Sequence, residues 1–92
     1  SVPTRDMKKE IAFCGTKSGR DVDKFKECRL KTAPSRQVVS PIIQIPGIHF
    51  ECRIVYKNAI DPAHLTREYD PLYPEKDYHT LYFGEIQACY EV

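Results

Sequence analysis

Three polar residues alternate with apolar ones near the middle of the chain, and their side chains are of the types that carry out acid–base chemistry. His49, Glu51 and Arg53 occur within residues 48–58, Ile-His-Phe-Glu-Cys-Arg-Ile-Val-Tyr-Lys-Asn. On a β-strand they would share one face, with neighbours about 7 Å apart. An imidazole, a carboxylate and a cation can cleave RNA through its own 2′-hydroxyl. The alternative is a solvated strand face whose opposite charges pair weakly.

The strand that carries these residues has an apolar face as well. Its apolar positions alternate with the polar ones and are Ile48, Phe50, Cys52, Ile54 and Tyr56. This alternation predicts that the apolar face packs on the core and that the polar face stays open. A second β-branched run, Gln37 to Ile45, precedes Pro46-Gly47. We therefore expect an antiparallel hairpin at the centre of a sheet.

The other segments supply the remaining elements of the expected fold. Val22, Phe25 and Cys28 recur every three residues, which predicts an amphipathic helix of about three turns that begins near Ser18 and ends near Thr32. Short apolar runs predict strands over Glu10 to Cys14 and over Thr80 to Tyr90, the latter with a bulge or close approach at Gly84. Residues 1–9 have no period and are expected to be a mobile segment, which leaves residues 10–92 as a single domain. The order of elements predicts an α+β domain with one helix packed on an antiparallel sheet.

A long connection runs from Asp61 to Tyr78 and has neither helical nor strand periodicity. So long a loop in a small domain is more often functional or mobile than structural. Its tyrosines, Tyr69, Tyr73 and Tyr78, combine a large contact area with a polar tip, as at protein interfaces and base-stacking surfaces. We expect them to form a binding surface; the alternative is that they fill the core beneath the loop.

Size, charge and cysteine content set the broad class. A chain of 92 residues with 41% hydrophobic residues has a thin core. Four cysteines without a C-x-x-C pair favour two disulfides over a metal site or free thiols, and hence a secreted protein. Of the three possible pairings we favour Cys14 with Cys89 and Cys28 with Cys52. The net charge of +1 indicates no nucleic-acid or membrane partner attracted by bulk charge.

Several kinds of site find no support in the sequence. His64 and His79 have no serine or cysteine arrangement that would suggest a catalytic triad, so we expect them to be surface residues. There is no glycine loop of the phosphate-binding type, no apolar run of transmembrane length and no signal peptide. We expect no cofactor and no metal, and a mature chain from which a signal has been removed.

The order of several short motifs resembles a known family. These motifs are Phe13-Cys14-Gly15, Asp21-Val22 opening a helix, Ser40-Pro41-Ile42, Arg53 to Asn58, and a closing strand with Gly84 and a late cysteine. Together they resemble the fungal guanyl-specific ribonucleases, and still more the ribonuclease-like secreted effectors of powdery mildew fungi known as RALPH effectors. The resemblance covers roughly Ile11 to Tyr90 and implies a microbial ribonuclease-like fold.

The residues that such a ribonuclease needs are mostly absent. Arg53 matches the family's arginine, although Cys52 stands where an acidic residue precedes it. Val39 stands in place of the catalytic glutamate and Ala88 in place of the catalytic histidine. The family's early tyrosine and histidine have no counterpart between Lys31 and Gln37. The resemblance therefore implies the fold of a ribonuclease without its acid and base.

We accordingly expect a secreted virulence effector that is translocated into the host plant cell. It would act as a monomer that binds host proteins, would be recognised by a plant immune receptor, and would bind RNA weakly if at all. One alternative is an RNA-cleaving or RNA-binding protein that uses His49, Glu51 and Arg53. The other is a secreted inhibitor or toxin that acts through the 61–78 loop.

Overall fold

The computed structural model describes every residue from Ser1 to Val92, and its elements confirm the α+β class. The elements are, in chain order, β1 (Val2–Pro3), α1 (Lys8–Thr16), α2 (Lys24–Glu27), β2 (Thr32–Ala33), β3 (Ile42–Ile43), β4 (Gly47–Ala59), the 3₁₀ helices η1 (Pro62–His64) and η2 (Arg67–Leu72), and β5 (Thr80–Glu91). The chain divides into two units, one of residues 1–52 with 86–92 and one of residues 53–85.

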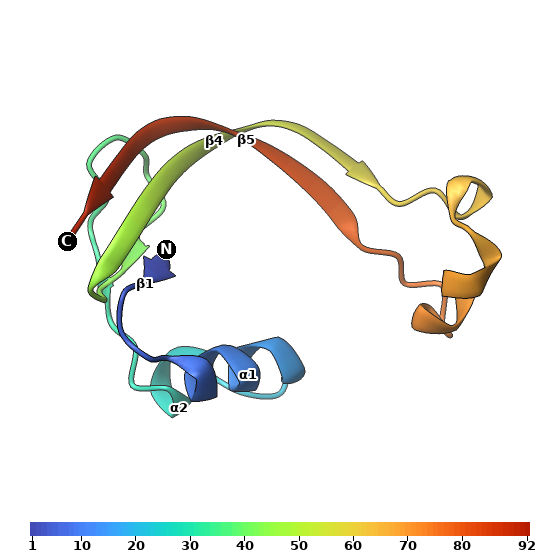
Figure 1. The fold of residues 1–92 in the computed structure, drawn as a ribbon, viewed down its shortest axis with the longest axis horizontal. Coiled ribbons are helices and arrows are strands. Elements are labelled where there is room, and N and C mark those ends of the chain that lie inside the picture. Colours follow the sequence, from blue (N-terminus) through green and yellow to red (C-terminus); the bar gives the residue numbers. More distant parts are fainter. The chain divides into compact units, whose positions relative to one another are not determined.

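The two long strands are the predicted ones. β4 and β5 run side by side (Figure 1), and β1 pairs antiparallel with the first residues of β4. Gly47 and Val92 exchange two backbone hydrogen bonds of 3.0 and 2.9 Å, and Ile60 N–H donates to the His79 carbonyl at 2.9 Å. These pairs at the two ends of the ladder have the same register, so the predicted irregularity at Gly84 inserts no net residue.

The first half of the chain departs from the prediction. The segment predicted as a strand at residues 10–14 lies in α1, where Ile11 N–H donates to the Met7 carbonyl at 2.9 Å and Lys8 N–H donates to the Asp6 carboxylate at 3.1 Å. Lysine, glutamate and alanine are good helix formers, and a short apolar run does not by itself distinguish strand from helix. Residues 1–9, for which no element was predicted, contribute β1 and the start of α1.

The three-turn helix predicted near residues 18–32 is wrong in length. Only α2 forms there, with the Asp23 carboxylate accepting from Lys26 N–H at 3.2 Å as its N-terminal cap. Arg29 follows the helix with φ at 52°, a left-handed conformation that ends it. The triplet spacing of apolar residues was therefore not sufficient to sustain a longer helix.

The central hairpin predicted for residues 37–45 and 48–58 is also wrong. Only Ile42–Ile43 forms a strand in the first of these segments. It pairs antiparallel with β2, which precedes it in the chain, in a separate two-stranded sheet. The N–H groups of residues 36–38 donate to the Glu51 side chain, and Pro41 has no N–H. The segment therefore has few backbone donors left for a ladder with β4.

The core of the first unit is small, as its composition suggested. Met7 and Ile45 are its buried apolar side chains. They border a cavity of about 240 Å³ whose lining comes from the N-terminal segment, α1 and the β3 region. No single helix covers a sheet face in the way that was predicted; α1 and α2 instead lie beside each other (Figure 1), joined by a hydrogen bond of 2.7 Å from Lys24 Nζ to the Cys14 carbonyl.

Candidate functional site

The polar face of β4 is buried at His49 and Glu51, which reverses the prediction from the sequence for these two residues. His49 is 1% exposed and Glu51 2% exposed, whereas Ile48, Phe50 and Ile54 on the opposite face are exposed. The alternation itself is real, but the segments that cover β4 bring hydrogen-bond donors instead of apolar side chains. The buried face is therefore polar and fully hydrogen-bonded.

Glu51 accepts hydrogen bonds from four donors. The backbone N–H groups of Arg36, Gln37 and Val38 approach its carboxylate at 2.8, 2.6 and 3.2 Å, and the Tyr90 hydroxyl donates to the same group. Three successive N–H groups that converge on one carboxylate form an anion-binding concavity. In this protein the chain's own side chain fills it.

These contacts hold Glu51 in its ionised form. Burial raises the pKa of Glu51, but the hydrogen bonds from Arg36 N–H, the Tyr90 hydroxyl and the two following N–H groups outweigh burial and lower the pKa to about 2. The same contact raises the pKa of Tyr90, because the carboxylate stabilises its neutral hydroxyl. A carboxylate of such low pKa neither takes nor gives a proton efficiently near neutral pH.

His49 is equally committed to structural contacts. Its Nε2 lies 3.1 Å from the Ile45 carbonyl, and its Nδ1 lies 2.8 Å from the Ser1 hydroxyl. A carbonyl can only accept, so Nε2 carries the proton, and in the neutral imidazole Nδ1 accepts from Ser1. The ring also stacks on Tyr90, with centroids 5.7 Å apart. Neither nitrogen is free to face a substrate.

Arg53, the third candidate, does not join the other two. It lies in the second unit, exposed, with its guanidinium 3.6 Å from the Glu85 carboxylate. The polar cluster instead contains Arg36, whose guanidinium carbon lies 3.7 Å from the centre of the Tyr90 ring. Arg36 and Tyr90 were missed as partners of Glu51. The alternation of β5 could have suggested Tyr90 had the register been known, whereas nothing in the sequence marks Arg36.

The 61–78 loop has a defined local structure, with two 3₁₀ helices where no element was predicted. Of the three predicted binding tyrosines, Tyr69 is exposed, while Tyr73 and Tyr78 are half-buried against each other with ring centroids 4.9 Å apart. The Tyr73 hydroxyl also lies 2.6 Å from Nδ1 of His79. Two of the three tyrosines therefore serve to fold the loop.

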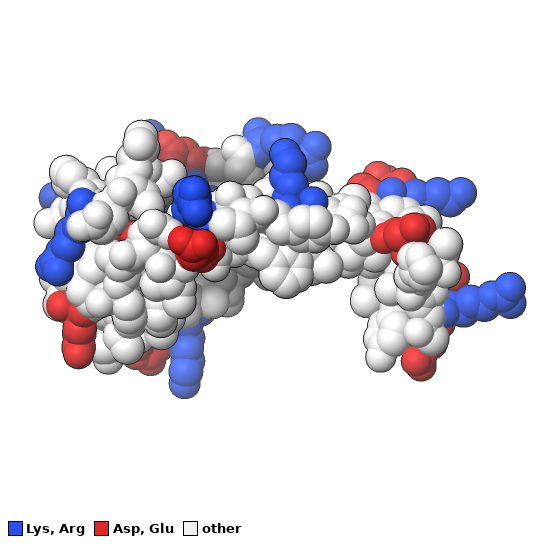
Figure 2. Space-filling view, turned by 90° about the horizontal axis from the view of Figure 1, so that it is seen from above, with Lys and Arg blue, Asp and Glu red and all other residues white.

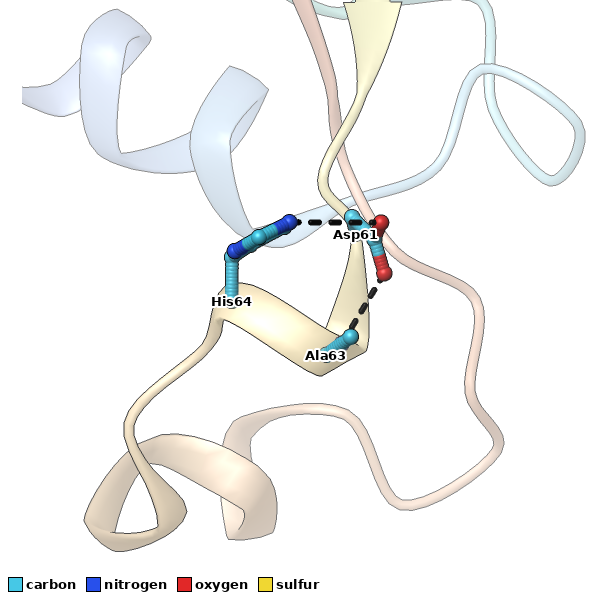
Figure 3. Close-up of polar contacts among 3 residues, drawn as sticks. All are labelled: Asp61, Ala63 and His64. Carbon is cyan, nitrogen blue, oxygen red and sulfur yellow. Dashed lines mark hydrogen bonds and ion pairs between the residues drawn. The ribbon is translucent and has the colours of Figure 1, made fainter.

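The start of this loop is organised by a carboxylate. Asp61 accepts from Ala63 N–H at 2.9 Å and lies 3.8 Å from Nε2 of His64, so the three residues close the first turn of η1 (Figure 3). His64 and Asp61 are both exposed, and an exposed pair of this kind contributes little stability. His64 and His79 thus have local partners and belong to no larger cluster of chemical groups.

None of the four cysteines forms a disulfide in the structure, so neither expected pairing is confirmed. Cys52 and Cys89 lie exposed on β4 and β5. Cys14 and Cys28 are partly buried, and their sulfur atoms are 3.9 Å apart. The structure therefore places together two cysteines that had been assigned to different bridges.

A group of exposed apolar side chains lies on the part of the β4–β5 ladder in the second unit. Six large apolar side chains there are between 51% and 62% exposed; we call them the ribbon patch, and they are Ile54, Val55, Tyr56, Leu81, Tyr82 and Phe83. Successive strand residues point to opposite faces, so both faces carry apolar groups.

Basic and acidic side chains are nearly equal in number, 14 and 13. Figure 2 shows one face, on which acidic and basic side chains are scattered among uncharged atoms without a large patch of one sign. No helix has the length and apolar character that crossing a membrane requires. Among the described residues, which are the whole chain, no group of three or more metal-ligating side chains occurs.

The fold and these sites define a small α+β protein with an internally hydrogen-bonded polar cluster and an exposed apolar ribbon. Comparisons with protein-family models, with curated proteins and with solved structures gave no match for this chain.

Proposed function

We propose that this chain acts by binding another protein through the ribbon patch and does not cleave RNA. The observation that carries the proposal is the exposure of all six patch residues. Two of the six, Tyr56 and Phe83, are in ring contact with centroids 5.7 Å apart, and clustered exposed apolar groups of this kind mostly mark interaction sites. A two-stranded ribbon is at best marginally stable by itself in water, so a partner that covers it would also stabilise it.

The ribbon suggests how a partner binds. It offers two apolar faces and open strand edges, to which an extended segment can add as a further strand. Three of the six patch residues are aromatic, and aromatic side chains often carry most of the energy of an interface. The fitting partner is therefore a protein that presents an apolar groove or an unpaired strand, not a polyanion.

The resemblance to the RALPH effectors supplies a biological setting. In that setting the chain is a secreted fungal effector with a disulfide-stapled, ribonuclease-like form of the α+β fold. Its partners are host plant proteins and an immune receptor, with RNA bound weakly or not at all. The absence of the family's acid and base at Val39 and Ala88 supports the non-catalytic part of this proposal.

The catalytic half of the proposal is tested by incubating the chain with single-stranded RNA and measuring cleavage and binding in parallel. We expect no cleavage, because His49 and Glu51 are buried and Arg53 pairs elsewhere. Cleavage by the wild type would overturn the proposal, and its loss in Arg53→Ala with the fold retained by circular dichroism would assign the exposed Arg53 to a relocated active site.

The binding half is tested with two matched variants. Phe83→Lys places a charge in the ribbon patch, and Val39→Lys places the same charge at a side chain that is 103% exposed outside it. Proteins of host extract retained by the wild type and by Val39→Lys but lost from Phe83→Lys would be ribbon partners. If all three chains retained the same host proteins, or if none retained any, the proposal would be contradicted. Self-association of the chain in analytical sedimentation would identify a second copy as the partner.

A specific observation also favours the inhibitor or toxin alternative. The 61–78 loop folds into η1 and η2 and packs Tyr73 against Tyr78, so it presents a structured surface. An ordered loop can enter a target enzyme without a large loss of chain entropy. Tyr69→Ala, which removes the exposed tyrosine of η2, would then abolish partner binding while Phe83→Lys would not.

A further inference from the structure

We infer that Cys14 and Cys28 form a thiol pair that a small disulfide, such as oxidised glutathione, converts into an intramolecular disulfide. Their sulfur atoms are 3.9 Å apart, in hydrogen-bond contact as thiols. A disulfide bond of about 2.05 Å requires the two atoms to approach by only about another 2 Å. The inference does not depend on the ribbon patch or on the proposed function.

The two sulfur atoms are placed by neighbouring helices. Cys14 lies in the second half of α1, and Cys28 is the C-terminal cap of α2, with its N–H donating to the Lys24 carbonyl at 3.0 Å. Lys24 Nζ in turn donates to the Cys14 carbonyl at 2.7 Å. One lysine therefore connects the backbones that carry both thiols, and it keeps them facing each other.

The surroundings of Cys28 favour its neutral thiol at rest. Burial raises the pKa of Cys28, and the Cys14 side chain and the carboxylates of Glu10 and Glu27 raise it further. Lys24 faces the pair but its ammonium is engaged by a carbonyl. Because the thiolate is the nucleophile in thiol–disulfide exchange, the second step, attack by Cys28, should accelerate as pH rises.

The reaction balances with one disulfide reagent. The Cys14 thiolate attacks one sulfur of the reagent, whose other half leaves as a thiolate and takes up a proton, and a mixed disulfide forms. The Cys28 thiolate then attacks the Cys14 sulfur and releases the second half of the reagent. Two protein thiols are oxidised, one small disulfide is reduced to two thiols, and the protons of Cys14 and Cys28 end on those thiols.

The test is disulfide mapping of the full chain after equilibration in a buffer of oxidised and reduced glutathione. Unpaired thiols are blocked by alkylation, and the chain is digested with trypsin without reduction. Lys17, Arg20, Lys24 and Lys26 lie between the two cysteines, so cleavage separates them and a linked pair of peptides reports the bond. We expect the Cys14–Cys28 link, with Cys52 and Cys89 alkylated.

Short loops close readily even in an unfolded chain, so the same reaction in 6 M guanidinium chloride is the essential control. We expect the Cys14–Cys28 equilibrium constant to be roughly ten-fold or more higher in the native chain than in denaturant, because the fold holds the thiols together. An equal constant in both conditions would overturn the inference. So would native links of Cys14 with Cys89 or of Cys28 with Cys52.

Two variants identify the reacting atoms. Cys52→Ser combined with Cys89→Ser should oxidise like the wild type, since neither residue is part of the pair. Cys14→Ser should leave Cys28 as a thiol or as a mixed disulfide with glutathione. If circular dichroism shows that either variant does not fold, the wild type still tests the inference. The test is then the ratio of its Cys14–Cys28 equilibrium constants in native buffer and in denaturant.

Discussion

A single carboxylate organises the polar cluster, and its ionisation should make stability depend on pH. Glu51 has a folded pKa of about 2 and an ordinary value of 4.5. A lowered folded pKa stabilises the protein fully above pH 4.5, and this contribution is lost as pH falls from about 4.5 towards 2. Thermal unfolding measured across this range should show the loss in the wild type.

Glu51→Gln tests the assignment, because an amide cannot offer two acceptor oxygens to three N–H groups and a hydroxyl. We expect the variant to melt roughly 5 °C or more lower at pH 7 and to show a flatter profile between pH 4.5 and pH 2. Glu75→Gln, at an exposed loop position, should retain the wild-type profile. A wild-type profile in Glu51→Gln would show that the carboxylate is not held as described.

Tyr90 should report on the same contact from the other side. Its pKa is raised by the Glu51 carboxylate, so this contact stabilises the fold fully below pH 10 and the contribution is lost as pH rises through the folded pKa. Absorbance at 295 nm should show one tyrosine that ionises later than the others. Tyr90→Phe should remove that late step, and Tyr69→Phe should leave it in place.

The candidate site shows how far residue patterns reach. The alternation of His49 and Glu51 correctly predicted that they share a strand face. It could not predict that this face is buried, because the groups that cover it are the backbone N–H donors of residues 36–38. Backbone N–H groups occur in nearly every residue of any sequence and therefore give no sequence signal. Their approach depends on a long-range contact that local periodicity does not encode.

At the scale of elements, the long strands were predictable and the short pieces were not. β4 and β5 are long enough for alternation to be distinctive, and both were predicted within a residue or two. α1 was mistaken for a strand and β3 was given the wrong partner, because each contains too few residues for one period to exclude another. The pairing of β1 with β4 involves two residues that carry no signal of their own.

That small pairing makes a sharp prediction at Gly47. A Cβ atom at this position would lie 2.2 Å from the Val2 carbonyl oxygen, so the backbones of β1 and β4 are too close for any side chain. Gly47→Ala should reduce the free energy of unfolding by about 2 kcal/mol or more. Chemical denaturation is the measurement; Gly15→Ala, where a Cβ meets nothing within 4 Å, is the control and should cost less.

At the scale of the whole molecule, the two units should differ in local stability. The buried side chains lie in the first unit, whereas the strand residues of the second unit are exposed. Amides of residues 53–59 and 80–85 should therefore exchange with solvent faster than those of residues 47–52, since their hydrogen bonds open without breaking a core. Hydrogen exchange followed by mass spectrometry measures this difference.

Binding of a partner to the ribbon patch should abolish the difference, because a covered ribbon no longer opens independently. Equal protection of both units in the isolated chain would contradict the division described here. It would also remove the physical reason for proposing that the ribbon needs a partner.

The hydrogen bond from Tyr90 to Glu51 has a consequence for the protein while it is being made. The two residues are 39 positions apart, so Glu51 is synthesised well before its hydroxyl donor. Until then Glu51 lacks its hydroxyl donor, His49 lacks the ring that stacks on it, and Gly47 lacks the backbone of Val92. The polar cluster therefore cannot close before residues 90–92 have been synthesised, and we expect that a chain truncated before residue 90 does not reach this fold.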